Sequence, residues 1–347
     1  MKAARNYGSG DIRIEDLVLP PILEDEVKIT VEWAGICGSD KHSYERKMAR
    51  NGAFTMGHEF SGTVKEVGAD VKSCKPGDRV VVNPLFTCGK CLPCRQGYSN
   101  LCENLVLFGL NRIFGAFAEE TTVKEHMVIK IPDNLPLDIA ALAEPTCIAA
   151  HGLRISKFKP GDTAAVFGAG PIGLLMISLL KASGCTKIYA VSRTKSKLDL
   201  SLKLGATAVI SSDEEDPAKK IKELTADRGG VDIAFEISGA ESCWTAAMNC
   251  LRAKGELVMI SLPGQPLPYE TRTALHKEIT VLTSQCSNGE FPMVAELLAS
   301  GAVQAADVIT KKIYLDDLVE EGFEALIKDN NQLKVLVTPK RENLTAR

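Results

Sequence analysis

The chain has 347 residues, enough for two domains with a buried core each, and its formal net charge of −3 gives no electrostatic case for binding nucleic acid or an anionic membrane. Its first ten residues contain no apolar signal segment, and the apolar run at residues 172–180 is too short to span a bilayer. Eleven cysteines are an odd number, which argues against a complete disulfide framework, so we expect free thiols in a reducing cytoplasm.

Short strand-like segments fill the first part of the chain. Residues 27–33, 62–67 and 79–83 are rich in β-forming residues and are separated by turns that contain Gly, Pro and Asp. This pattern predicts a small, partly open β-barrel.

Metal-ligand residues lie between these strands. Cys37 stands in the segment GICGSDKH, and His58 and Glu59 stand in MGHEFSG. Zn²⁺ accepts such ligands at catalytic sites, where three protein ligands leave one position open. Neighbouring residues of a strand point to opposite faces, so His58 and Glu59 can both bind a metal only if the backbone bends there. Otherwise one of them supports the site from outside the coordination sphere.

Four cysteines follow within one stretch that also contains Gly and Pro: Cys88, Cys91, Cys94 and Cys102. The C-x2-C-x2-C-x7-C spacing predicts one tetrahedral Zn²⁺ held by four thiolates, with no position left for a substrate. We therefore expect this zinc to be structural and the chemistry to take place elsewhere. An iron–sulfur cluster is the alternative for four thiolates at this spacing.

Glu144, in the segment ALAEPTC, is the natural additional carboxylate for the upstream metal site. The Glu-Pro step that follows it is stiff and would hold the side chain in place. Cys147, three residues later, is the competing candidate.

Beyond residue 150 the pattern changes, and apolar strand-like runs alternate with helical ones. This alternation predicts a doubly wound parallel sheet, and therefore an α/β fold. The expected strands lie at residues 164–167, 188–191, 208–210, 233–237, 257–261 and 279–283.

The first of these strands is followed by a Gly-rich turn and then by a helical run. The turn is the G-x-G-x-x-G pattern formed by Gly168, Ala169, Gly170, Pro171, Ile172 and Gly173. Between a strand and a helix, this pattern lets the backbone approach a pyrophosphate at the N-terminus of the helix. We therefore expect a dinucleotide here, and the alternative is a Gly-rich turn between core elements.

The second of these strands runs into Ser192 and Arg193. An NAD-binding sheet usually carries an acid at this point, which binds the ribose 2′-hydroxyl, but the segment Ser-Arg-Thr-Lys contains no carboxylate. A guanidinium forms bidentate bonds with phosphate oxygens, so Ser192 and Arg193 predict a 2′-phosphate and a preference for NADP(H) over NAD(H). The alternative is that Arg193 only decorates the exposed start of a helix.

The last part of the chain has helix-like segments at residues 293–299 and 317–328 and a strand-like segment at 334–337. It contains too few apolar residues for a core of its own, so we expect it to return to the first domain. The predicted domains are residues 1–150, residues 151–288 and the return at 289–347.

Taken together, GICGSDKH, GHEFSG, the four cysteines, the Glu-Pro step and VFGAGPIGLL resemble the zinc-dependent medium-chain dehydrogenases. The resemblance runs over essentially the whole chain and is strongest to the polyol branch, which includes sorbitol, butanediol and galactitol-1-phosphate dehydrogenases. It implies a GroES-like catalytic domain and a Rossmann domain. It also implies that Cys37 and His58 bind a catalytic zinc, that Glu59 is a ligand or a close supporting carboxylate, and that Glu144 binds the metal directly or through its water.

The resemblance also implies roles around the first of these ligands. Ser39 and His42 match the positions of a proton relay, and Asp40 would orient a ligand histidine. The expected reaction is the reversible oxidation of a secondary alcohol in a polyol, polyol phosphate or vicinal diol to the ketone. Hydride would pass to NAD(P) while the proton leaves through Ser39 and His42. We expect a homodimer or homotetramer that acts on this small-molecule substrate.

Several alternatives remain within and beyond this family. An L-threonine or aldose (glucose) dehydrogenase would keep the same zinc sites. A non-catalytic zinc-binding relative would keep the four cysteines and lose the upstream ligands, and a zinc-free quinone or enoyl reductase would lack both sets, whereas both are present here. Some butanediol dehydrogenases lack the four-cysteine segment, so its presence here weakens the assignment of butanediol as the substrate.

Overall fold

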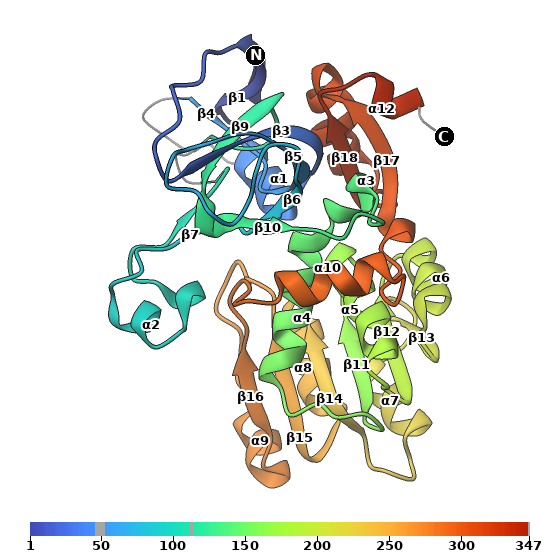
Figure 1. Ribbon diagram of the computed structural model, residues 1–347. Helices are drawn as coiled ribbons and strands as arrows, with labels where there is room; N and C mark the ends of the chain where they lie inside the picture. Colours follow the sequence, from blue (N-terminus) through green and yellow to red (C-terminus); the bar gives the residue numbers. More distant parts are fainter. Residues whose placement is uncertain (46–52, 111–113, 346–347) are drawn as a thin grey trace. The chain divides into compact units, whose positions relative to one another are not determined.

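The computed structural model describes residues 1–45, 53–110 and 114–345, and the chain forms two compact units (Figure 1). Unit 1 comprises Met1–Glu144, Asn288–Ser300 and Ile309–Arg347, and unit 2 comprises Pro145–Ser287 and Gly301–Val308.

These limits differ from the expected ones in three places. One difference is a single residue, since the return begins at Asn288 and not at residue 289. The chain leaves unit 1 at Glu144, within helix α4 (Ala143–Ile155), and not at residue 150. A continuous helix carries no break in its sequence pattern, so the boundary inside it was not visible. Residues 301–308 belong to unit 2 and not to the return, because Val303 and Val308 are buried there and the Gln304 N–H donates to Ser178 Oγ at 2.9 Å.

Unit 1 is built on a sheet with the strand order β10-β6-β5-β3-β18-β17, in which β9 also pairs with β3. Only the β17–β18 pair is parallel among the strand pairs described for this sheet. The strands are β3 (Glu26–Gly35), β5 (Glu59–Val67), β6 (Arg79–Val82), β9 (Glu120–Lys124), β10 (Val128–Lys130), β17 (Ile309–Tyr314) and β18 (Lys334–Thr338). The end of the chain therefore contributes two strands, β17 and β18, to the sheet of unit 1.

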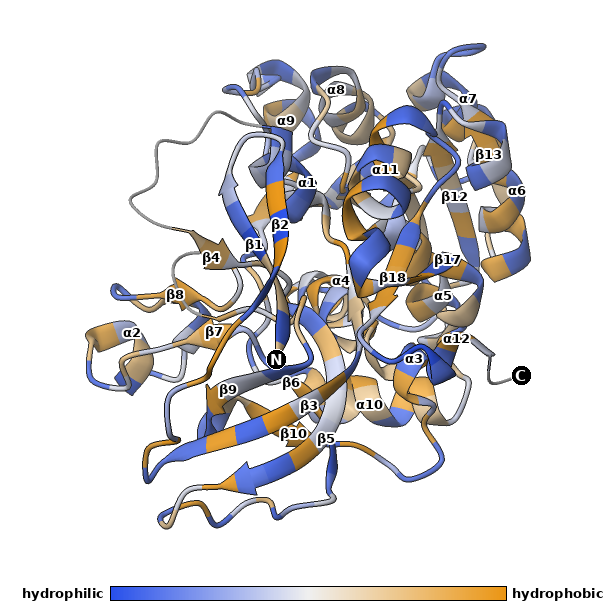
Figure 2. Cartoon of the chain, turned by 90° about the horizontal axis from the view of Figure 1, so that it is seen from above, coloured by the Kyte–Doolittle hydropathy of each residue, from blue (hydrophilic) through white to orange (hydrophobic). Residues whose placement is uncertain are grey.

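The central strand β3 shows why the sheet forms. Its hydrophobic residues alternate with polar ones (Figure 2). Val27, Ile29 and Val31 are fully buried. A period of two places one face of a strand in the core and the other toward a polar environment. On the buried face, β3 joins a core that includes Phe60 of β5 and Val335 of β18.

Smaller elements complete unit 1. A second sheet has the order β2-β1-β4, with β1 (Lys2–Gly8), β2 (Asp11–Asp16) and β4 (Phe54–Thr55), while β7 (Leu85–Phe86) pairs with β8 (Val106–Leu107). The helices are α1 (Gly38–Glu45), α2 (Leu92–Arg95), α3 (Leu137–Ala140), α10 (Phe291–Ala299), α11 (Ala325–Lys328) and α12 (Glu342–Thr345), and 3₁₀ turns lie at Ser99–Leu101, Glu125–Met127 and Leu315–Asp317.

One helical segment differs from the prediction. The single helix expected at residues 317–328 is a π-helix at Leu318–Glu324 that continues into α11. A π-helix forms i→i+5 hydrogen bonds and occurs mostly as a single turn within a helical segment, and one turn is too short to leave a period of its own in the sequence.

The strand register brings the ends of three strands of unit 1 together. Gly35, at the end of β3, pairs with Glu59 of β5 on one side and with Leu336 of β18 on the other. Cys37 follows two residues after Gly35, and Lys334 begins β18. Residues from the start and the end of the chain therefore meet where the candidate ligands lie.

Unit 2 is a parallel sheet with the order β13-β12-β11-β14-β15-β16, and its middle strands are buried. The strands are β11 (Thr163–Phe167), β12 (Lys187–Ser192), β13 (Ala208–Ser211), β14 (Val231–Glu236), β15 (Leu251–Met259) and β16 (Thr280–Thr283). Besides most of α4 and a 3₁₀ turn at Ala306–Val308, the helices are α5 (Pro171–Ala182), α6 (Lys195–Leu204), α7 (Pro217–Leu224), α8 (Glu241–Asn249) and α9 (Thr271–Lys277). This confirms the predicted doubly wound sheet, whose order reverses direction beside β11.

No helix in the described part of the chain is long and apolar enough to cross a membrane.

Candidate active site and metal centres

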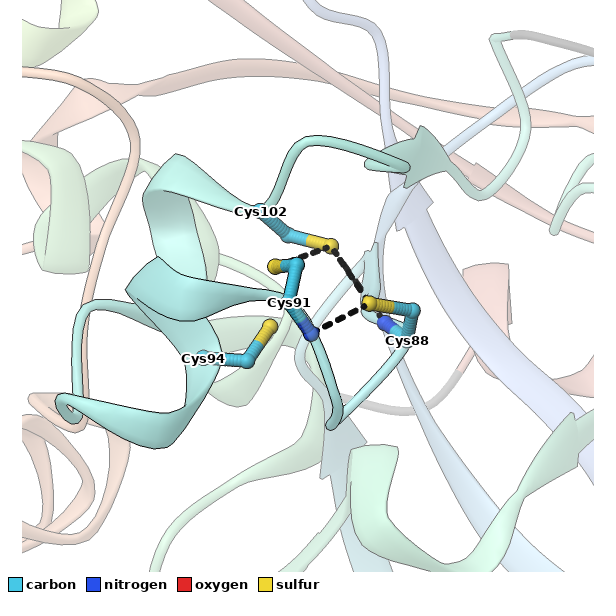
Figure 3. A group of neighbouring side chains, drawn as sticks. All are labelled: Cys88, Cys91, Cys94 and Cys102. Atoms are coloured by element: carbon cyan, nitrogen blue, oxygen red, sulfur yellow. Dashed lines mark hydrogen bonds between the residues drawn. The ribbon is translucent and has the colours of Figure 1, made fainter.

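The four cysteines of unit 1 converge on one point (Figure 3). Cys88 precedes α2, Cys91 caps it, Cys94 lies within it and Cys102 follows a 3₁₀ turn. All four Sγ atoms lie within 4.8 Å of one another. Local turns alone bring the four sulfur atoms together, because all four cysteines lie within one short segment.

The distances between the sulfur atoms suit a tetrahedral metal. Cys102 Sγ lies 3.5 Å from Cys88 Sγ and 3.8 Å from Cys91 Sγ, while four sulfurs at about 2.3 Å from Zn²⁺ would be about 3.8 Å apart. These are free thiols and not disulfides. Backbone N–H groups of Lys90 and Cys91 lower the pKa of the Cys88 thiol to about 6, which favours the thiolate that a metal binds.

A second cluster lies where β3 and β5 end. Cys37 Sγ, an imidazole nitrogen of His58 and a carboxylate oxygen of Glu59 lie within 4.8 Å of one another. His58 stands just before β5, and Gly57 has a φ of +94°. The backbone therefore turns ahead of the strand, and the two neighbouring side chains reach the same point although they would diverge within a regular strand. Both can face one ion.

Asp40 supports His58 from the first turn of α1. Its Oδ1 lies 3.6 Å from His58 Nδ1, and its Oδ2 accepts the Cys37 N–H at 3.0 Å. Burial opposes a charge on His58, but the charges of Asp40 and Cys37 outweigh it and raise the pKa of the imidazole. Because Asp40 faces Nδ1, this geometry leaves the other ring nitrogen to the cluster, the arrangement typical of metal-binding histidines.

Lys334 was not anticipated as part of this site. Its ammonium forms an ion pair with Glu59 Oε2 and donates to the Ile36 carbonyl oxygen at 3.1 Å, and both charged side chains are almost completely buried. The cross-strand register of β5, β3 and β18 produces this contact. Burial alone would lower the pKa of the Lys334 ammonium, but the charges of Glu59, Cys37 and Glu144 outweigh it and raise that pKa.

Glu144 lies near this cluster, because charges in the cluster shift its pKa, but it is not one of the three clustered residues. Among the described residues, the ligand atoms within 4.8 Å of one another are those of Cys37, His58 and Glu59 and do not include Glu144. Desolvation is the main cause that raises the pKa of the Glu144 carboxyl to about 7; the His58 charge lowers it and the Glu59 charge raises it. The competing Cys147 is fully buried in α4.

The expected relay residues lie on α1. Ser39 Oγ is buried and has no hydrogen-bond partner in the described structure, whereas His42 is exposed. The two residues are three positions apart, so they share one face of the helix. A buried hydroxyl two residues from the candidate ligand Cys37 and an exposed imidazole on the same face suit outward transfer of a proton.

In unit 2, the backbone of the Gly-rich turn depends on glycine at two positions and is open at a third. Gly168 has a φ of +105°, which only glycine adopts readily, and a Cβ on Gly173 would lie 1.8 Å from the Gly168 carbonyl oxygen. A Cβ on Gly170 would meet nothing within 4 Å, so this position opens onto free space at the N-terminus of α5. Pro171 and Ile172 begin that helix. An anion could therefore bind at this turn, next to the N-terminus of α5.

Ser192 ends β12, and the exposed Arg193 follows it. Arg193 is close enough to Cys243 of α8 for its charge to lower the pKa of that thiol, although burial raises it overall. Arg193 therefore lies beside the carboxyl ends of the central strands, where dinucleotides bind in sheets of this order.

Comparisons with known proteins agree with both units. Residues 23–133 match the family described as an alcohol dehydrogenase GroES-like domain, and residues 171–300 match the family described as a zinc-binding dehydrogenase. The chain is 42% identical to (R,R)-butanediol dehydrogenase of Bacillus subtilis over 98% of this chain and 100% of the relative. It is 36% identical to sorbitol dehydrogenase of the same organism over 98% of each.

Among solved structures, a Sinorhizobium meliloti protein described as a zinc-binding dehydrogenase bound to NADP has a TM-score of 0.91. It is 31% identical and covers 97% of this chain and 99% of its own. The fold and the comparisons define an NAD(P)-dependent oxidoreductase. The chain belongs to the zinc-dependent medium-chain dehydrogenases, in their polyol branch.

This membership confirms the predicted α/β fold with a GroES-like and a Rossmann part, and it confirms an enzyme that acts on CH–OH groups. It argues against the non-catalytic and zinc-free alternatives. The roles of the individual site residues stay predictions.

Proposed function

We propose that this dehydrogenase oxidises a secondary alcohol with a neighbouring hydroxyl, in a vicinal diol, a polyol or a polyol phosphate, to the ketone with NADP(H). One zinc would be held by Cys37, His58 and Glu59, with Glu144 as an additional carboxylate. A second, structural zinc would be held by the four cysteines. The observation that carries the proposal is the convergence of one thiol, one imidazole and one carboxylate within 4.8 Å, next to a further carboxylate.

This donor set fits zinc and is richer in oxygen than one with two thiolates. When bound, Zn²⁺ supplies a Lewis acid that accepts four or five ligands, which suits a substrate with two adjacent oxygens. Asp40 and His58 would hold each other in orientation. Ser39 would take the proton of the reacting hydroxyl and pass it toward His42, which is exposed to solvent.

The cofactor part of the proposal rests on unit 2. Gly168, Gly170 and Gly173 would hold the pyrophosphate, and Ser192 and Arg193 would bind a 2′-phosphate. The Sinorhizobium meliloti protein bound to NADP supports a nicotinamide cofactor of this kind. The expected homo-oligomer and cytoplasmic location stay predictions.

An initial-rate panel of secondary alcohols tests the substrate. It includes vicinal diols, polyols and polyol phosphates, with ethanol and 2-propanol as simple alcohols, and L-threonine and glucose for the alternative family members. We expect the best diol or polyol to exceed ethanol by at least about tenfold in kcat/KM, because the second oxygen helps to position the reacting carbon. Ser39→Ala should slow the best substrate by roughly two decades. Equal rates with ethanol, or a preference for L-threonine or glucose, would refute the diol and polyol assignment.

Replacing Arg193 tests the cofactor. Arg193→Ala should reduce kcat/KM with NADP(H) by about one to two decades and leave NAD(H) nearly unchanged, since a charge-assisted contact contributes about 1.5–3 kcal/mol. Lys195→Ala is the matched control, because Lys195 is an exposed cation two residues further on, at the start of α6. An equal effect of the two variants on both cofactors would mean that Arg193 is only a surface residue.

A further inference from the structure

Helix α1 links the two candidate relay residues to a metal-ligand residue, yet it is a weak helix by itself. It has eight residues, follows directly after Cys37, and buries only the side chains of Asp40 and Tyr44. Helices of this length are not stable alone in water, so contacts with the rest of unit 1 must set the position of α1.

The two buried side chains fix the two ends of the helix. At the first turn, Asp40 accepts the Cys37 N–H at 3.0 Å. At the last turn, the Tyr44 hydroxyl donates to Glu324 Oε1 at 2.8 Å, and the Tyr44 ring stacks on Phe323 with 4.9 Å between ring centroids. Burial, followed by this hydrogen bond, raises the pKa of Tyr44 to about 12, so the hydroxyl remains a donor.

Both partners of Tyr44 belong to the π-helix at Leu318–Glu324. This segment also packs against the residue that precedes Cys37, since a Cβ on Gly322 would lie 2.8 Å from Ile36 Cδ1. The π-helix therefore contacts the chain on both sides of the relay residues. π-helices are rare, and single turns of this kind are frequent at functional sites.

We propose that the π-helix and Tyr44 form an anchor for α1, and that Tyr44 and Glu324 are positioning residues for proton transfer through Ser39 and His42. The inference rests on the proposed relay. The ion pair of Glu324 with Lys328 does not compete with Tyr44, because it uses Oε2 and the Lys328 side chain is exposed. A shift of α1 by a fraction of a turn would separate Ser39 Oγ from the reacting hydroxyl, and displacements of about 1 Å can cost up to about 100-fold in rate.

Tyr44→Phe is the direct test, because it keeps the ring on Phe323 and removes only the hydroxyl. We expect kcat with the best substrate to fall about tenfold and the solvent deuterium isotope effect on kcat to rise, since the proton step becomes slower. Zinc content and the affinity for the nicotinamide cofactor should stay at wild-type values. Tyr7→Phe is the matched control: Tyr7 also donates to a glutamate, Glu15, at 2.7 Å in unit 1, but it joins β1 to β2 on the surface.

Variants of the acceptor make the test independent of Tyr44. Glu324→Gln retains a carbonyl oxygen and should behave like the wild type. Glu324→Ala should reproduce Tyr44→Phe, and the double variant should be no slower than either single one, because the same hydrogen bond is lost.

The outcomes separate the anchor from the relay. If Tyr44→Phe and Glu324→Ala keep the wild-type rate and isotope effect while Ser39→Ala is slow, the anchor is overturned and the relay stands. If Ser39→Ala is silent, the proposed relay fails and the anchor with it. If the loss of activity in Tyr44→Phe is matched by a loss of zinc or by an equal loss of folded protein, the role of Tyr44 is merely structural. That result would also overturn the proposal.

Discussion

Replacing Lys334 with Met should destabilise unit 1 far more than the loss of an ordinary surface charge. Lys334 and Glu59 are 2% and 1% exposed, so the variant would leave a buried carboxylate without its ammonium. Removing one partner of such a pair costs about 3–5 kcal/mol. At roughly 2–4 °C per kcal/mol for a unit of this size, the melting temperature should fall by roughly 6–20 °C.

Lys340→Met provides the matched control. Lys340 pairs with Glu32 in the same unit, but these side chains are 31% and 13% exposed, so solvent screens this pair more than the buried one. Its contribution should therefore be closer to the value for exposed pairs, about 0–1 kcal/mol. Thermal and urea unfolding followed by circular dichroism would measure both variants. Adding Glu59→Gln to Lys334→Met should recover part of the loss, because an amide is less costly to bury than a charge. Equal melting temperatures for the two lysine variants would refute the argument.

Lys334→Met should also respond more strongly than the wild type to removal of the metal. In wild-type protein without zinc, Lys334 still balances the charge of Glu59. In Lys334→Met without zinc, Glu59 has lost both the ammonium and the metal, and the imidazole of His58 is the basic group that remains within 4.8 Å of it. We therefore expect chelation to lower the melting temperature of Lys334→Met more than that of the wild type, and an equal decrease in both would contradict a shared role for Lys334 and the metal.

Other predictions concern the zinc proposed at Cys37 and the Gly-rich turn. Cys37→Ala should reduce the zinc content from about two ions per chain to about one and abolish turnover, since only the four-cysteine site remains intact; two retained ions by atomic emission would exclude Cys37 as a ligand. Gly173→Ala should lower the melting temperature markedly because the new methyl group would collide with the Gly168 carbonyl. Gly170→Ala should leave the melting temperature nearly unchanged and weaken cofactor binding by about tenfold or more in calorimetry, and unchanged affinity would argue against pyrophosphate at this position.

Sequence patterns are most informative where the relevant residues are close together in the chain. The four cysteines span a single short segment, so their spacing alone fixes which atoms can meet. The Gly-rich turn is likewise local, and the conformations of Gly168 and Gly173 follow from the strand and helix that flank them. Alternating strands and helices were sufficient to predict the parallel sheet of unit 2.

Contacts between distant segments were not predictable in this way. Lysine side chains are nearly always exposed. Lys334 is buried because β18 pairs with β3, and β3 with β5, which brings Lys334 next to Glu59 although the two residues are 275 positions apart in the chain. The hydrogen bond between Tyr44 and Glu324 joins residues that are 280 positions apart. It also depends on a π-helix too short to be recognised from the spacing of hydrophobic residues in the sequence. Whether His58 and Glu59 could share one ion depended on the backbone conformation at Gly57, which the sequence left open.

The pairing of β18 with β3 affects the order in which the protein can assemble during synthesis. Lys334 is translated 275 residues after Glu59, an interval of about 14–55 s at about 5–20 residues per second. Until then β3 lacks one of its neighbours, and Glu59 lacks its ammonium. The parallel sheet of unit 2, whose strands are all complete by Thr283, can form while the ribosome still holds the C-terminal segment. A chain that stops before β18 would retain the candidate ligands Cys37, His58 and Glu59 but would have an open sheet edge, which is a common template for aggregation.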